Sequence, residues 1–170
     1  TAHFHESSEI TLFDNNHKQV GSFSVKVPEG WKHVQNITPY GPVTKKLFDK
    51  DGKSNEILVE FHDAFNGENK YLTRAYDVNT GEIKFEMEGT GLVFDASKGW
   101  NSYQRLIMTH ESDSLYNIDV IAPPALGKDN WYVEHTFSFN IDNRISYLQG
   151  SCFNCMNVDG TPYYVLAQYE

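Results

Sequence analysis

The histidine at position 135 is the side chain in this sequence whose setting is most typical of a reactive group. It lies in segment 131–139, where odd positions carry Trp, Val, His, Phe and Phe and even positions carry Tyr, Glu, Thr and Ser. This two-residue alternation predicts a β-strand with one apolar face, on which His135 is the single polar side chain. Because an imidazole titrates near neutral pH, His135 is a candidate general acid or base toward a bound substrate.

Arg105 is a second candidate, on a predicted strand that begins at Tyr103. It alternates with Tyr103 and Ile107 on one face, where a guanidinium could orient a bound ligand. Asn117 and Asp119 lie on the next predicted strand, and which way they point depends on which face of that strand is buried. Polar groups on an apolar wall are costly unless they are paired, so these groups either pair with one another or contact a ligand.

His135 and Arg105 also have a purely structural interpretation. A histidine on an apolar face is usually satisfied by a neighbour, here a tyrosine hydroxyl, and Arg105 then pairs with an acidic side chain at the rim. The functional alternative is a small-molecule pocket with one cation, one imidazole and aromatic walls. The residues that we predict to line this pocket are Trp31, Phe61, Tyr71, Trp100, Tyr103, Trp131, Val133 and Phe137.

The three tryptophans support a different hypothesis. Exposed Trp rings on a β-sandwich can stack on sugar rings, and Trp100 follows Lys98 and Gly99 in a predicted loop. A carbohydrate-binding module with a surface Trp platform is therefore a further possibility. Packing in the core or at its rim is the alternative for each ring, including Trp31 and Trp131.

Other reactive motifs in the sequence are incomplete. Cys152 and Cys155 form a Cys-Phe-Asn-Cys unit between strand-like runs, which favours a disulfide within a turn or two buried thiols over redox chemistry. His3, His5 and Glu9 have the spacing of a metal-binding strand, but at the start of the chain two exposed histidines are the better interpretation. No nucleophile elbow or phosphate-binding loop occurs. We predict no metal and no cofactor.

The elements that must position these groups are β-strands. From residue 56 onward, alternating apolar and polar runs follow one another with short turns between them. In segment 82–88, Ile83, Phe85 and Met87 alternate with charged residues, which predicts that these three side chains share one buried face. An earlier hairpin is predicted over residues 10–27.

Two segments are predicted to be irregular. Residues 1–7 are polar, and we expect a flexible N-terminal tail. Residues 32–53 contain two prolines and two glycines and are longer than a simple connection needs, so we interpret them as a lid or binding loop.

This pattern predicts an all-β fold. Hairpin turns join most strands and no helical periodicity is present, so we predict one domain over residues 1–170, a calycin-like, up-and-down antiparallel β-barrel. A β-sandwich or jelly roll is the alternative. A barrel of about eight strands encloses either packed side chains or one small ligand.

Composition and charge narrow the partners and the location. The formal net charge of −9 repels nucleic acid and anionic membranes, so we predict neither as a partner. The chain starts at Thr1, which we interpret as a processed chain that is secreted or periplasmic. Asn36-Ile37-Thr38 is an acceptor sequence for glycosylation in a eukaryotic secretory route. Exposed edge strands could pair two copies into a homodimer.

These observations lead to three functional hypotheses. We predict that the protein is a non-catalytic carrier of a small apolar or aromatic ligand held inside the barrel. The second hypothesis is an isomerase, cyclase or lyase that uses the same cavity, with His135 as acid or base and Arg105 orienting the substrate. The third is the carbohydrate-binding module. The sequence leaves the ligand and the presence of catalysis open.

Overall fold

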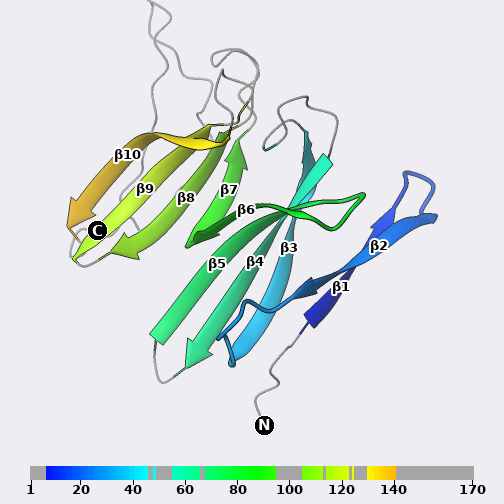
Figure 1. Ribbon diagram of the computed structural model, residues 1–170, viewed down its shortest axis with the longest axis horizontal. Coiled ribbons are helices and arrows are strands. Elements are labelled where there is room, and N and C mark those ends of the chain that lie inside the picture. The colour runs from blue at the N-terminus through cyan, green and yellow to red at the C-terminus, as the bar shows by residue number, and fades with distance from the viewer. Residues whose placement is uncertain are drawn as a thin grey trace, which may run out of the picture. The chain divides into compact units, whose positions relative to one another are not determined.

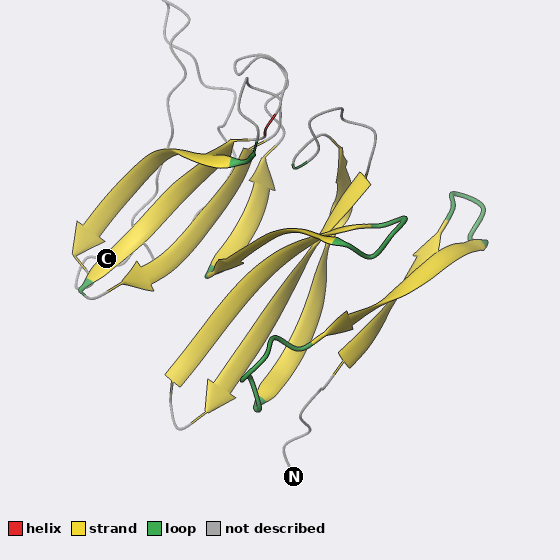
Figure 2. Ribbon diagram, in the orientation of Figure 1, coloured by secondary structure: helices red, strands yellow, loops and turns green. Residues whose placement is uncertain are grey.

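The computed structural model describes residues 7–45, 48, 55–65, 68–94, 105–112, 114–122, 124 and 130–140. These residues form ten β-strands in three antiparallel sheets and contain no α-helix (Figures 1 and 2). The all-β class is therefore confirmed. Within the same residues no sheet closes into a barrel, and no helix is long and apolar enough to cross a membrane. The chain forms two compact units, residues 1–45 with 53–90 and residues 46–52 with 91–170.

The first unit contains a two-stranded hairpin and a four-stranded sheet. The sheet follows the chain in the order β3-β4-β5-β6, so each strand pairs with its neighbour in sequence. The strands are β1 (Ser7–Phe13), β2 (Gln19–Lys26), β3 (Val34–Lys45), β4 (Asn55–Phe65), β5 (Glu68–Asp77) and β6 (Ile83–Glu88).

The turn between β1 and β2 is held by the side chain of Asp14. Its Oδ1 accepts the backbone N–H groups of Asn16 at 2.8 Å and Lys18 at 2.9 Å. This arrangement confirms the predicted hairpin and explains the asparagine-rich turn, since short polar side chains satisfy the backbone locally. Ser7 already belongs to β1, so the predicted tail is wrong at this residue, and residues 1–6 lie outside the described part.

Residues 34–45 form strand β3, so interpreting this part of 32–53 as an irregular lid is wrong. The prolines are tolerated because β3 is the outer strand of its sheet as described, where a missing N–H need not cost a ladder hydrogen bond. The pairing with β4 also shifts between Tyr40 and Thr44, around the Gly-Pro pair. Asn36, the acceptor residue noted above, is exposed on this strand.

The core of the first unit lies between the hairpin and one face of the sheet. Ile10 and Val25 of the hairpin pack with Val59 and Phe61 of β4 and Leu72 of β5. Each fully buried apolar side chain of this size stabilises the fold by about 1.5–3 kcal/mol. The alternation predicted for β4 is correct, because Ile57, Val59 and Phe61 all belong to this cluster.

Arg74 of β5 ties the hairpin to the sheet. Its Nη1 donates to the carbonyl oxygen of Lys26 at 2.9 Å, across 48 residues of sequence, and its guanidinium carbon lies 5.2 Å from the ring centre of Phe61. The same side chain bonds the hydroxyl of Tyr76 and the carboxylate of Glu86. One cation therefore joins β2, β4, β5 and β6.

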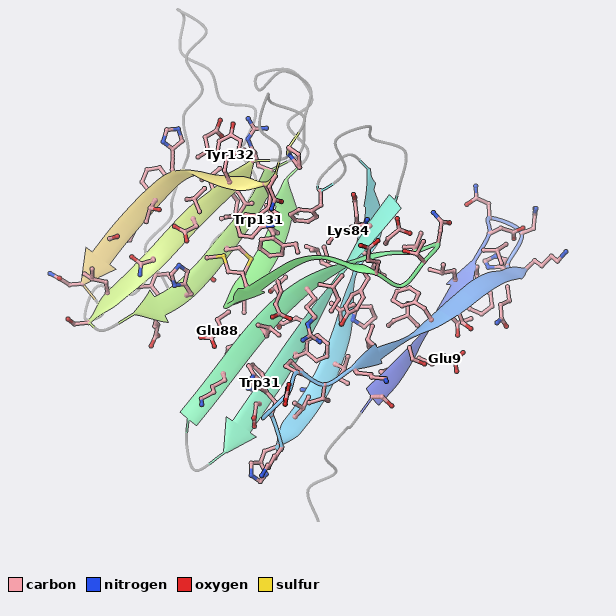
Figure 3. The ribbon with its side chains drawn as sticks, in the orientation of Figure 1. Glu9, Trp31, Lys84, Glu88, Trp131 and Tyr132 are labelled. Atoms are coloured by element: carbon pink, nitrogen blue, oxygen red, sulfur yellow. The ribbon has the colours of Figure 1, made fainter. Side chains whose placement is uncertain are left out.

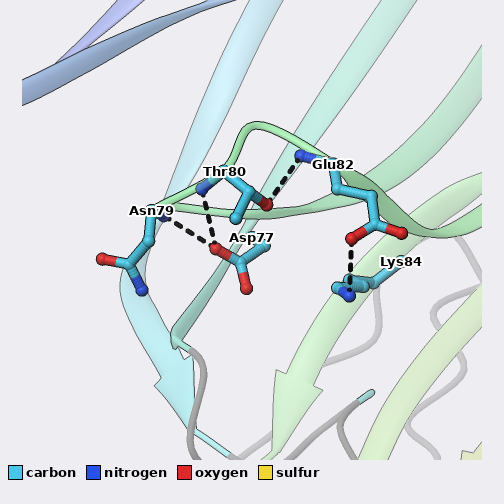
Figure 4. Close-up of polar contacts among 5 residues, drawn as sticks. All are labelled: Asp77, Asn79, Thr80, Glu82 and Lys84. Carbon is cyan, nitrogen blue, oxygen red and sulfur yellow. Dashed lines mark hydrogen bonds and ion pairs between the residues drawn. The ribbon is translucent and has the colours of Figure 1, made fainter.

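The turn from β5 to β6 is a compact hydrogen-bonded unit (Figure 4). Asp77 Oδ1 accepts the N–H groups of Asn79 at 2.8 Å and Thr80 at 3.0 Å, and Lys84 pairs with Glu82 at 2.9 Å. Gly81 completes this turn and takes a positive φ of 72°, which glycine adopts at little cost.

Strand β6 contains one residue more than its partner requires. Ile83 faces Tyr76 and Phe85 faces Ala75, so Lys84 is the inserted residue of a β-bulge. Ile83 is consequently exposed while Phe85 is buried. The prediction that Ile83, Phe85 and Met87 share one face is wrong at Ile83.

The second unit contains a four-stranded sheet of order β10-β9-β8-β7. Its strands are β7 (Thr90–Phe94), β8 (Arg105–Ser112), β9 (Leu115–Ala122) and β10 (Tyr132–Asn140). β7 follows β6 after the single residue Gly89, whose φ of 113° favours glycine. β9 lies between β8 and β10 and is buried on both faces from residue 117 to 122.

Candidate functional site

Strands β8, β9 and β10 bring most of the polar candidates together, on two opposite faces of one sheet. Side chains of paired residues point to the same face, so the register assigns each residue to a face. The aromatic face carries Arg105, Ile107, Tyr116, Ile118, Val120, His135, Phe137 and Phe139. The polar face carries Met108, His110, Asn117, Asp119, Val133, Thr136 and Ser138.

A β-bulge in β10 changes the face to which its side chains point. Val133 pairs with Ile121 and His135 pairs with Val120, which leaves Glu134 as an inserted residue. Since one extra residue moves every later side chain to the other face, Val133 and His135 point to opposite faces. The prediction of one uninterrupted apolar face along 131–139 is therefore wrong.

His135 lies on the aromatic face but is exposed. Its ring centre is 6.5 Å from that of Phe137, in a tilted arrangement. The predicted burial of His135 is wrong, because β10 is the outermost strand of its sheet as described. Its assignment as an acid or base stays a prediction.

Arg105 is buried on β8 and forms a two-point ion pair with Glu134 of β10. Its Nε donates to Glu134 Oε2 at 2.9 Å and its Nη2 donates to Oε1 at 3.3 Å. The bulge makes this pairing possible, because it turns Glu134 out of the regular alternation. The structural interpretation of Arg105, pairing with an acid, is confirmed, and this carboxylate neutralises its charge.

A row of side-chain hydrogen bonds crosses the polar face, and we call it the polar ladder. Asp119 of β9 is buried, and its Oδ1 accepts the hydroxyl of Thr136 at 2.6 Å. Its Oδ2 lies 2.9 Å from Nε2 of His110 on β8. One step along, Asn117 Oδ1 accepts the hydroxyl of Ser138 at 2.7 Å. The buried carboxylate is therefore satisfied by side chains from both flanking strands.

Two members of the ladder, Asn117 and Asp119, were open candidates from the sequence, and the other three were missed. His110, Thr136 and Ser138 are polar residues that alternate along predicted strands, which is also typical of a solvated face. Only the pairing of Thr136 with Asp119 and of Ser138 with Asn117 reveals the row.

Within each unit, the residues predicted to line one pocket are divided between the two faces of a sheet. Phe61 and Tyr71 point to opposite faces of their sheet: Phe61 is in the first core, while Tyr71 stacks on His62 at 4.5 Å between ring centres. Trp31 packs against the first core, and Trp131 in the second unit is half-buried (Figure 3). The remaining candidates lie outside the described residues, namely Trp100, Tyr103, Cys152 and Cys155.

No protein-family model, curated protein or solved structure matches this chain. Among the residues that the structure describes, no three His, Cys, Asp or Glu side chains lie close enough together to hold a metal ion. The arrangement on β8–β10 therefore has to be interpreted from its own chemistry. It offers a partly accessible aromatic surface on one face and an imidazole–carboxylate pair on the other.

Proposed function

We propose that the protein binds a small apolar or aromatic ligand without transforming it, on the aromatic face of β8–β10. The observation that carries this proposal is the packing of that face. Ile107, Ile118 and Val120 form a buried floor, and Phe137 and Phe139 pack on it while remaining partly accessible. A rigid apolar floor with accessible aromatic rings is typical of small-molecule sites.

The polar groups beside this surface favour a neutral ligand. Arg105 is already paired with Glu134, so an anionic ligand would have to compete with an ion pair held at two points. The exposed His135 adds one polar ring at the edge of the surface. These features suit a largely apolar molecule with at most one polar group.

The closed barrel is part of the same proposal. In both four-stranded sheets the strands are neighbours in the order of the chain, which is the connectivity of an up-and-down meander. A meander of about eight strands can close around one small ligand. We propose that the aromatic face lines such an interior.

Titration with the neutral fluorescent probe N-phenyl-1-naphthylamine tests the ligand site. We expect saturable binding and about tenfold weaker affinity for Phe137→Ala, equivalent to about 1.4 kcal/mol. Phe13→Ala is the matched control, because Phe13 is 62% exposed on β1 in the first unit and should leave the affinity unchanged. Absence of saturable binding, or equal affinities for Phe137→Ala and wild type, would exclude the aromatic face as the site.

Single substitutions test the two alternative functions, an enzyme and a carbohydrate-binding module. If the protein is an enzyme that uses His135, then His135→Ala removes turnover and leaves ligand affinity nearly intact. If it is a carbohydrate-binding module, then Trp100→Ala abolishes binding to a glycan array. The packing of Trp31 against the first core does not favour a sugar platform at that ring.

A further inference from the structure

We propose that His110 is a general base, oriented by Asp119, for a small molecule that carries a weakly acidic C–H or O–H group. The site lies on the polar face, opposite to the proposed ligand surface, so the two proposals are independent. The evidence is the geometry of the polar ladder.

The contact with Asp119 determines which ring nitrogen of His110 carries the proton. Nε2 lies 2.9 Å from Asp119 Oδ2, and no other hydrogen bond of His110 occurs within the described residues. A carboxylate acceptor fixes the proton of a neutral imidazole on the nitrogen that it contacts. The lone pair is then on Nδ1, and the side chain, at 23% exposure, remains accessible to a small molecule.

Asp119 is held by hydrogen bonds to both of its carboxylate oxygens. Its other oxygen accepts the hydroxyl of Thr136 at 2.6 Å, and its side chain is 8% exposed. Both oxygens are therefore committed, one on each side, and the carboxylate has little freedom to rotate. The ring of His110 is therefore held in one orientation by a carboxylate that is itself fixed.

The hydroxyl groups of the polar ladder limit which substrates fit beside His110. Thr136 and Ser138 donate their hydroxyl protons to Asp119 and Asn117, so toward a ligand they present acceptor lone pairs. The ladder thus favours a molecule that donates. In the reaction, the proton passes from the ligand to Nδ1, its electron pair stays on the ligand, and the proton later returns to the ligand or to water.

A measurement on the unaltered protein tests the orientation. In ¹⁵N NMR spectra of the neutral form, we expect Nδ1 of His110 to be the unprotonated nitrogen. We expect Asp119→Asn to weaken this preference. A proton found on Nδ1 in the wild-type protein would overturn the proposal whatever the variants do.

The reactivity is tested with 5-nitrobenzisoxazole, in which a base removes the C–H proton, the N–O bond breaks and a cyanophenolate forms. We expect His110→Gln to lose at least about tenfold of the rate, and Asp119→Asn to fall between this variant and wild type. His17→Ala, at the exposed turn of the β1–β2 hairpin, is the matched control and should react like wild type. Equal rates for wild type and His110→Gln would refute the assignment, and loss only in His135→Ala would transfer it to that residue.

Discussion

The two units each contain an arginine–glutamate pair between strands, and the pairs differ in what surrounds them. Arg74 and Glu86 join β5 to β6 in the first unit, with side chains 11% and 48% exposed. Arg105 and Glu134 join β8 to β10 in the second unit, with side chains 2% and 26% exposed. The first carboxylate is about half exposed to water, whereas the second pairs with an arginine that is almost completely buried.

Because of this difference, the two carboxylates should contribute differently to stability. An exposed carboxylate adds little net stability, because solvent and salt screen it. Arg74 instead acts through its other contacts, with the Lys26 carbonyl, Tyr76 and Phe61. Arg105 is buried, so removing the carboxylate of Glu134 takes a negative charge away from a cation in the interior, and Glu134 should matter more than Glu86.

Replacing each of the two glutamates in turn tests this difference most directly. We expect Glu134→Gln to lower the free energy of unfolding by about 3 kcal/mol, since it removes the negative charge from a buried pair. Glu86→Gln, the matched control, should cost less than about 1 kcal/mol. Urea unfolding at 25 °C measures both, and equal losses would contradict the distinction.

The contacts of Arg74 are tested by Arg74→Met, which keeps an apolar stem and removes the charged fork. We expect a loss of about 2 kcal/mol, from hydrogen bonds to a charged group and the contact with Phe61. Amides of β1 and β2 should then exchange hydrogen faster, because the hairpin loses its tie to the sheet. Arg74→Lys should recover less than half of the loss, since an ammonium does not reproduce the fork. Full recovery would show that charge alone is sufficient.

The sequence predicted these units well where the strands are regular. The hairpin and the alternation of β4 followed from residue periodicity and turn chemistry. The errors at Ile83 and at Val133 have one physical cause: an inserted residue, Lys84 or Glu134, that reverses the faces along the strand. A bulge leaves no signature in a two-residue alternation, because the letters still alternate.

The candidate site could be predicted only in part, for a related reason. Arg105 was expected to find an acid, but Glu134 lies 29 positions away and reaches it only through the bulge. The ladder depends on which residue of β10 stands opposite Asp119, and register is a property of the paired strands. Local sequence predicts a strand and its faces; it does not predict this pairing.

Tyr76 provides a test at alkaline pH. Burial raises its pKa, and the hydrogen bond and charge of Arg74 lower it by less. Burial by itself lowers the pKa of Arg74, but its bonds to Tyr76 and Glu86 more than offset this, so Arg74 stays cationic.

Above about pH 10, the usual tyrosine pKa, the unfolded chain releases a proton that the folded protein retains. The free energy of unfolding should therefore fall with rising pH until the raised pKa of Tyr76 is passed. Tyr76→Phe should show a smaller fall between neutral pH and pH 11, and an identical fall would contradict the raised pKa.

High salt should weaken the two ion pairs to different extents, and we expect this change in coupling energy to be small. The Debye length falls to about 3 Å at 1 M salt, so a pair in contact with water is screened and a buried pair much less. Double-mutant cycles with Gln for each Glu and Met for each Arg give the two coupling energies.

We expect the Arg74–Glu86 coupling, at most about 1 kcal/mol in dilute buffer, to fall by at least half in 1 M NaCl. The Arg105–Glu134 coupling should change by a smaller fraction, because Arg105 is 2% exposed. If salt weakened both couplings in the same proportion, burial would not be what separates the two pairs, and the greater cost of Glu134→Gln would have to come from the bulge that Glu134 occupies.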